Sequence, residues 1–116
     1  MEMDLQIRTR IVESIPVIDL SGELDAYTCS MFRDAIIDVI EQGHPSVVVN
    51  MSEVEYIDSS GLGTLVGGLK RSSEKGGKIA VVCSANQICK VFEITGLEKV
   101  FPIFKDETDA AHALIV

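Results

Sequence analysis

The chain has 116 residues, which is the length of one domain, and 47% of them are hydrophobic, as is usual for a globular protein. Its formal net charge is −8 and its 10 Lys and Arg residues are scattered, which argues against nucleic-acid binding because phosphates require clustered basic residues. No apolar run approaches the roughly 18 residues that span a bilayer, and the N-terminus lacks the apolar core of a signal peptide. We therefore expect a cytoplasmic protein that binds neither nucleic acid nor membrane.

The first half of the chain predicts a hairpin followed by a helix. Two short β-like runs, LQIRTRIV (5–12) and IPVIDLS (15–21), are joined through ESIP. The next run, AYTCSMFRDAIIDVIEQG (26–43), has helical spacing, with Asp25 as its expected N-cap and Gly43 as its expected end. The apolar residues that share one face of this helix are Cys29, Phe32, Ala35, Ile36, Val39 and Ile40.

Two continuous apolar runs in the middle of the chain, SVVVNM (46–51) and KIAVVC (78–83), are rich in β-branched residues. Such runs are typical of strands that are covered on both faces, and hence of central parallel strands. Between them lies EYIDSSGLGTLVGGLK (55–70), which predicts the end of a strand followed by a helix. The helical spacing there comes from Leu62, Leu65, Val66 and Leu69.

The last third of the chain predicts a helix, an edge strand and a final helix. SANQICKVFEITG (84–96) is helical in pattern, VFPIF (100–104) is a strand that Pro102 places at a sheet edge, and DETDAAHALIV (106–116) is the last helix. The complete order is β-β-α-β-α-β-α-β-α, which predicts an α/β domain with a mixed, largely parallel sheet flanked by helices.

The residues that carry most enzyme chemistry are sparse. The two histidines, His44 and His112, are not placed by the sequence near any serine, so no Ser-His-Asp triad is expected. No His, Cys and Asp cluster has metal-ligand spacing. The three cysteines predict buried, reduced thiols rather than a disulfide. We expect neither an enzyme nor a bound metal or cofactor.

Asp58-Ser59-Ser60 stands at the predicted junction of strand and helix, and four glycines follow it, at positions 61, 63, 67 and 68. One interpretation is that Ser59 or Ser60 caps the helix, which contributes about 1 kcal/mol. Capping does not explain the glycines, each of which costs about 1 kcal/mol against alanine inside a helix. They either leave the serine hydroxyls open to another protein or allow the helix to pack tightly on its own sheet.

A nucleotide is a further possibility, since helix N-termini attract anions. The run GLGTLVGG only partly matches the dinucleotide-binding pattern, because Val66 stands where the third glycine belongs.

Three segments strongly resemble the anti-sigma factor antagonists, which are single-domain members of the STAS family. They are SGELDAYTCSMFRDAI, VVVNMSEVEYIDSSGLGTLVGGLKRSSEKGGKIAVV and VFEITGLEKVFPIF, and together they span most of the chain from about Leu20 to Phe104. The resemblance implies that residues 1–116 form one STAS domain. It also implies a partner-switching protein whose unphosphorylated form binds an anti-sigma factor that is also a serine kinase. Phosphorylation releases this partner, and a phosphatase of the protein-phosphatase-2C type reverses the modification.

The resemblance assigns roles to particular residues. Ser59 matches the phosphorylated serine, and Asp58 precedes it. Asp25 matches a loop aspartate beside the phosphorylation site, although it serves equally well as a helix cap. The residues that match the partner-facing start of the helix are Ser60, Gly61, Leu62 and Gly63, of which Leu62 also belongs to the apolar stripe. Two other functions stay open: a STAS module of a transporter or signalling scaffold, and a nucleotide-binding STAS protein.

Overall fold

A five-stranded mixed sheet forms the centre of the protein in the computed structural model, which describes residues 5–84 and 86–115. The strands lie in chain order and are β1 (Leu5–Val12), β2 (Ile15–Leu24), β3 (Val47–Ile57), β4 (Ile79–Val82) and β5 (Ile103–Phe104). The pair β1 and β2 is antiparallel, and every other neighbouring pair is parallel. The predicted hairpin, parallel centre and edge strand after Pro102 are therefore confirmed.

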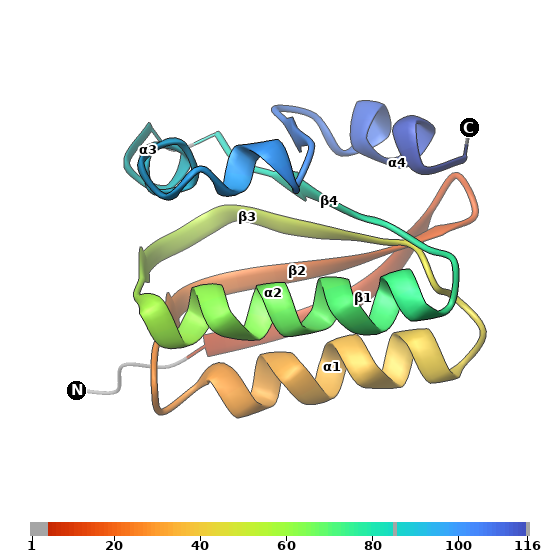
Figure 1. Ribbon diagram of the computed structural model, residues 1–116, viewed down its shortest axis with the longest axis horizontal. Coiled ribbons are helices and arrows are strands. Elements are labelled where there is room, and N and C mark those ends of the chain that lie inside the picture. Colours follow the sequence, from red (N-terminus) through yellow and green to blue (C-terminus); the bar gives the residue numbers. More distant parts are fainter. Residues whose placement is uncertain (1–4, 85, 116) are drawn as a thin grey trace.

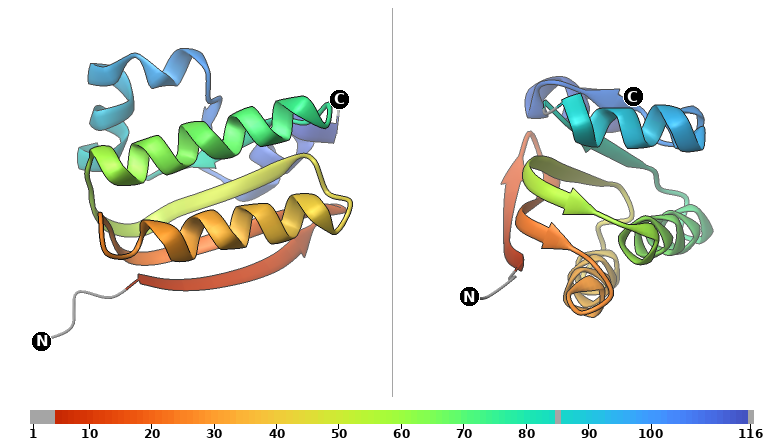
Figure 2. Two further views of the ribbon diagram at one scale, coloured as in Figure 1. Left: turned by 60° about the horizontal axis from the view of Figure 1, so that its bottom comes forward. Right: turned by 90° about the vertical axis from the view of Figure 1, so that its left-hand side faces the viewer.

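Helices cover the sheet unequally on its two faces (Figures 1 and 2). The helices are α1 (Cys29–Glu41), α2 (Ser59–Glu74), α3 (Asn86–Thr95) and α4 (Glu107–Ile115), with a short 3₁₀ helix η1 (Leu97–Lys99). The face that carries α1, α2 and α3 holds the larger apolar core, and α4 covers a smaller cluster on the opposite face. The predicted order of elements is confirmed.

The apolar run of β3 follows from this two-sided cover. Val47 and Val49 belong to the larger core, whereas Val48 between them packs in the cluster beneath α4. Successive side chains of a strand point to opposite faces, so a strand that is covered on both needs apolar residues throughout. Asn50 and Ser52 continue the Val48 side of the strand and are only half-buried, which marks the place where the run becomes polar.

The start of α1 differs from the prediction. The helix begins at Cys29 with Thr28 as its N-cap residue, three positions later than Asp25 would place it. The Asp25 carboxylate instead accepts hydrogen bonds from the N–H groups of Tyr27 (2.9 Å) and Thr28 (3.1 Å), and so it shapes the turn that precedes the helix. Aspartate favours such turns for the same reason that it favours caps, which is why the sequence alone did not separate the two roles.

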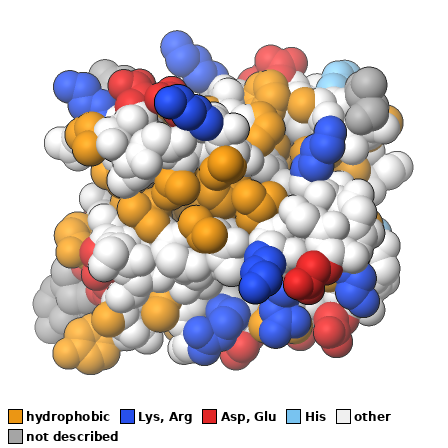
Figure 3. All heavy atoms as spheres, viewed as in Figure 1, with side chains coloured by type: hydrophobic (Ala, Val, Ile, Leu, Met, Phe, Trp, Pro, Cys, Tyr) orange, Lys and Arg blue, Asp and Glu red, His pale blue; other side chains and the backbone are white. Residues whose placement is uncertain are grey.

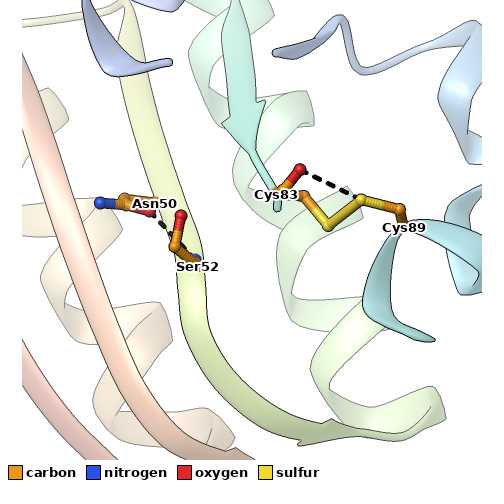
Figure 4. Close-up of a disulfide and its surroundings, with 4 residues drawn as sticks. All are labelled: Asn50, Ser52, Cys83 and Cys89. Carbon is orange, nitrogen blue, oxygen red and sulfur yellow. Dashed lines mark hydrogen bonds between the residues drawn. A yellow bond between two sulfur atoms is a disulfide. The ribbon is translucent and has the colours of Figure 1, made fainter. Parts of the chain in front are cut away.

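The prediction that all three cysteines are reduced is wrong. Cys83 and Cys89 form a disulfide between the end of β4 and the first turns of α3, and Cys29 is the free cysteine (Figure 4). The Cα atoms of the pair are 5.9 Å apart, which is within the range that a disulfide requires. The sequence shows only that five residues lie between the two cysteines, whereas the turn of the chain between strand and helix brings them together. None of the described helices is long and apolar enough to cross a membrane.

Candidate functional site

The predicted site residues meet where β2 and β3 end side by side. Leu24 pairs with Ile57 at the last register position of the two parallel strands, and the N–H group of Asp58 donates to the Leu24 carbonyl (3.3 Å). Asp25 directly follows β2, and Asp58 directly follows β3. The structure therefore brings Asp25 and the Asp58-Ser59 pair, which are more than thirty residues apart in the sequence, to one edge of the sheet.

The cap of α2 is Asp58, not one of the serines. Its carboxylate accepts hydrogen bonds from the N–H groups of Ser60 (2.9 Å) and Gly61 (3.2 Å). Ser59 is consequently the first residue of the helix, and its side chain is exposed. Within residues 5–84 and 86–115, the Ser59 hydroxyl group makes no hydrogen bond. The capping interpretation of Ser59 and Ser60 is therefore wrong, because an aspartate one residue earlier already satisfies the N–H groups.

The glycines of α2 have two different structural roles. A Cβ atom at Gly61 would lie 2.8 Å from the Leu24 carbonyl oxygen, and one at Gly68 would lie 2.9 Å from Cδ1 of Ile36 on α1. These two glycines permit close packing against the rest of the protein. A Cβ atom at Gly63 or Gly67 would meet nothing within 4 Å. The interpretation of tight packing therefore holds for Gly61 and Gly68, whereas Gly63 and Gly67 leave the helix surface bare, because the two pairs lie on different faces of the helix.

A groove of about 400 Å³ runs between α1 and α2 and begins at Ser59. The residues that line it are Cys29, Arg33, Ile36, Ile37, Ser59, Ser60, Gly63, Thr64, Gly67, Gly68 and Arg71. Figure 3 shows Lys and Arg side chains gathered over these two helices, with acidic side chains among them. The open glycines leave the groove uncovered on the α2 side.

Arg33 and Arg71 are residues of the groove that the sequence analysis missed. Neither arginine forms an ion pair with any other described residue. Arg71 follows Ser59, Gly63 and Gly67 at the same spacing of four residues, and this repeat could have been read from the sequence as one stripe of a helix. The position of Arg33 beside the same groove could not, since it depends on how α1 and α2 pack.

The remaining predicted residues are placed differently. Ser60 is half-buried, and its carbonyl oxygen accepts a hydrogen bond from the Thr64 hydroxyl (3.0 Å). Leu62 is also half-buried and packs against the larger core. His112 lies 3.3 Å from Glu13 at the β1–β2 turn, which is at the opposite end of β2 from Asp25. The structure therefore does not bring this histidine to Ser59. No cluster able to hold a metal ion occurs in the part of the chain that the structure describes.

A second polar cluster lies on the other face of the sheet. Arg10 on β1 donates hydrogen bonds to Asp19 on β2 and to Glu107 at the start of α4. Asn50 donates to the same aspartate (3.0 Å). The hydrogen bonds from Arg10, opposed by partial burial, lower the pKa of Asp19 below its usual value. This cluster fastens α4 to the sheet, far from the groove.

Comparison with known proteins points to one family. The model of the STAS domain matches residues 6–110. The anti-sigma F factor antagonist of Paenibacillus polymyxa is 34% identical over 98% of each chain, and the anti-sigma-B factor antagonist of Staphylococcus aureus is 32% identical over 83% of this chain and 89% of its own. The crystal structure of an anti-sigma factor antagonist from Mycobacterium paratuberculosis has a TM-score of 0.86 at 28% identity, covering 100% of this chain and 98% of that one.

Proposed function

The chain belongs to the STAS domain family, and from this we propose that it is an anti-sigma factor antagonist that works by partner switching. Its unphosphorylated form binds an anti-sigma factor that is also a serine kinase, and so frees a sigma factor in the cytoplasm. Phosphorylation of Ser59 releases this partner. The observation that carries the proposal is the exposed Ser59 hydroxyl, which the capping of α2 by Asp58 leaves free for modification.

The chemistry of the switch is a phosphoryl transfer from ATP. The Ser59 Oγ atom attacks the γ-phosphorus, ADP leaves, and the hydroxyl proton passes to a base of the kinase. A phosphatase of the protein-phosphatase-2C type hydrolyses the phosphoserine to serine and phosphate. This protein is thus a substrate of both enzymes and needs no catalytic group of its own.

The added charge explains how modification separates the partners. Phosphate brings a charge of about −1.5 to −2 at neutral pH. In the protein itself this charge lies at the start of a helix, where the N–H groups and the dipole favour an anion. At a packed interface, Asp25 and Asp58 beside it add repulsion and the phosphate needs room. A loss of about 1.4 kcal/mol weakens binding tenfold, so a few kcal/mol suffice to release the partner.

We propose that the partner-facing surface consists of Asp25, Asp58, Ser60, Gly61, Leu62 and Gly63. Gly63 contributes by being open, since no described atom beyond the adjoining residues and backbone of α2 lies within 4 Å of where its Cβ would stand. Gly61 contributes indirectly, because its close contact with Leu24 sets the position of the helix start.

The test compares tagged wild type, Ser59→Ala and Ser59→Asp in the native host, with Ser73→Asp as the matched control at the far, exposed end of α2. Captured proteins are identified by mass spectrometry, and the affinity of the purified kinase for each variant is then measured. We expect Ser59→Asp alone to lose an ATP-binding anti-sigma kinase. If the wild type and all three variants retain the same partner, the switch at Ser59 does not exist.

The same capture experiment separates the other functions. A transporter subunit or a signalling scaffold in place of the kinase would favour a STAS module with a different duty. Equilibrium dialysis with GTP and ATP tests the nucleotide-binding alternative, which predicts saturable binding to the purified protein.

A further inference from the structure

Arg33 on α1 lines the groove that begins at Ser59 on α2. We propose that Arg33 is the internal cation that pairs with the phosphate group of phosphorylated Ser59 across this groove. The inference rests on the proposed phosphorylation of Ser59 and adds a residue on another helix that the modified state uses.

The space between the two residues is open along α2. Ser59, Gly63 and Gly67 are spaced four residues apart and so lie on one stripe of the helix. Apart from the adjoining residues and backbone of α2 itself, no described atom lies within 4 Å of a Cβ built at Gly63 or Gly67. A phosphate on Ser59 therefore has room to turn into the groove, where no side chain of this stripe stands between it and α1.

The packing of the helices places Arg33 on the correct side of the groove. Both helices begin at the same edge of the sheet and run side by side (Figure 2). They pack where Gly68 faces Ile36, and Arg33 lies about one turn closer to the start of α1. Long side chains in a helix tend to lean toward its N-terminus, and this tendency favours an approach of the Arg33 guanidinium group to the edge at which Ser59 lies.

The charges around Ser59 favour the same pairing. Asp25 and Asp58 follow the paired ends of β2 and β3, and their negative charges would repel a phosphate on Ser59. The chain carries a net charge of −8, so unpaired cations near the site are few. Arg33 and Arg71 line the groove and form no ion pair with another described residue. Arg71 is twelve residues beyond Ser59, or about 18 Å along the helix axis. Arg33 precedes Ile36, which faces Gly68, by three residues and so lies only about 9 Å beyond Ser59 along the axis, which makes it the nearer of the two.

The test uses protein in which phosphoserine is inserted at position 59 during translation, so that no kinase is needed. The second pKa of this phosphoserine is measured by ³¹P NMR titration in the wild type, Arg33→Gln and Arg71→Gln. A neighbouring cation favours the dianion and lowers that pKa. We expect Arg33→Gln to raise it by about 0.5 relative to the wild type, whereas Arg71→Gln, which removes the same charge from the same groove, leaves it unchanged.

Two additions keep the result interpretable. Arg33→Lys retains the charge but loses the forked geometry, and it should titrate between the wild type and Arg33→Gln. Thermal unfolding of the unphosphorylated variants should match the wild type, because Arg33 is exposed and has no ion-pair partner among the described residues.

Equal pKa values in Arg33→Gln and the wild type, or an equal change in Arg71→Gln, would overturn the proposal. The affinity of the phosphorylated wild type for the kinase is measured separately. If phosphorylation leaves that affinity unchanged, the proposed switch is wrong, but the effect of Arg33 on the pKa of the phosphoserine still stands.

Discussion

Asp58 accepts both hydrogen bonds at the start of α2, and the hydroxyl group of its neighbour Ser59 stays outside the interactions that stabilise the helix. Helix capping and the proposed regulation are thus assigned to two adjacent residues. A serine that both capped the helix and received phosphate would lose its capping role on modification. The separation allows Ser59 to be modified while the helix stays capped.

The first prediction concerns this pair of residues. Asp58→Ala removes the cap of α2 and should lower the free energy of unfolding by about 1 kcal/mol, with a range of roughly 0.5–2. Ser59→Ala should change it by less than about 0.5 kcal/mol, as is usual for an exposed position. Urea unfolding followed by circular dichroism measures both. A larger loss for Ser59→Ala than for Asp58→Ala would show that the serine is the cap after all.

The second prediction concerns the two kinds of glycine in α2. Gly61→Ala places a methyl group 2.8 Å from the Leu24 carbonyl oxygen and should destabilise the protein by about 1–3 kcal/mol. Gly63→Ala meets no neighbour and should stabilise the helix by up to about 1 kcal/mol. If the proposed interface is correct, Gly63→Ala also weakens binding of the kinase. Thermal unfolding measures the effect on stability, and a binding titration measures the effect on affinity for the kinase. If Gly63→Ala is more stable and also binds the kinase more tightly, Gly63 is not part of the interface.

At the scale of elements, α4 packs on the sheet mainly through small apolar side chains. The helix has nine residues, and its apolar contribution comes mainly from Ala110 and Ala111. Small side chains bury little apolar surface. The link from Arg10 to Asp19 and Glu107 therefore supplies an important part of its attachment.

The third prediction follows from the lowered pKa of Asp19, whose main cause is the hydrogen bonds from Arg10. A carboxyl group with a lowered pKa in the folded state stabilises the protein above its unfolded pKa of about 3.9 and loses that contribution as the pH falls through the folded pKa. Stability should therefore drop below about pH 4, by on the order of 1 kcal/mol from this group. Asp19→Asn should flatten the dependence of unfolding free energy on pH, and an unchanged slope would contradict the assignment.

The fourth prediction concerns α3, which the Cys83–Cys89 disulfide ties to the end of β4. Titration of the denatured, unreduced protein should find one thiol, that of Cys29, and full reduction should release three. Reduction should also lower stability by about 2 kcal/mol for so short a loop. Cys89→Ser cannot form the disulfide, so its stability should not change on reduction, and it serves as the control. Thiols in the cytosol are kept reduced, so protein quenched with acid directly from cells tests whether the disulfide forms there. Three free thiols in the purified, unreduced protein would contradict the disulfide.

At the scale of the whole molecule, Ser59 lies apart from the face of α2 that packs on the core. Ser59 is exposed at the start of α2, whereas the residues that hold this helix in place, Gly61, Leu65 and Gly68, are buried on its inner face. The α4 attachment lies on the opposite face of the sheet (Figure 1). A change of charge at Ser59 therefore acts at the surface and not on the packing.

The fifth prediction is that the fold survives phosphorylation. Protein with phosphoserine at position 59 should have the far-ultraviolet circular dichroism spectrum of the unmodified form and an unfolding free energy within about 1 kcal/mol of it, because a helix N-terminus favours an anion. Amide chemical shift changes should be confined to α1, the start of α2 and the turn after β2. Loss of helical signal on phosphorylation would mean that partner release occurs through unfolding.

The sequence by itself determined the order of the elements, the parallel centre of the sheet and the junction that carries Ser59. These features depend on local information, since apolar periodicity, turn residues and β-branched runs each act within a few residues of one another. The resemblance to the anti-sigma factor antagonists at Asp58-Ser59 also rests on neighbouring residues of one segment, so it can be recognised from the sequence. By contrast, whether Asp25 begins a helix or shapes a turn depends on where the chain after β2 meets α1.

Only the tertiary structure decided which distant residues act together. Arg10 and Glu107 meet although 97 positions separate them, and Arg33 shares a groove with Ser59 because α1 and α2 pack at Ile36 and Gly68. Cys83 and Cys89 are joined because the chain turns back between β4 and α3. Contacts of this kind are set by the packing of whole elements, which leaves no periodic trace in the sequence around either partner.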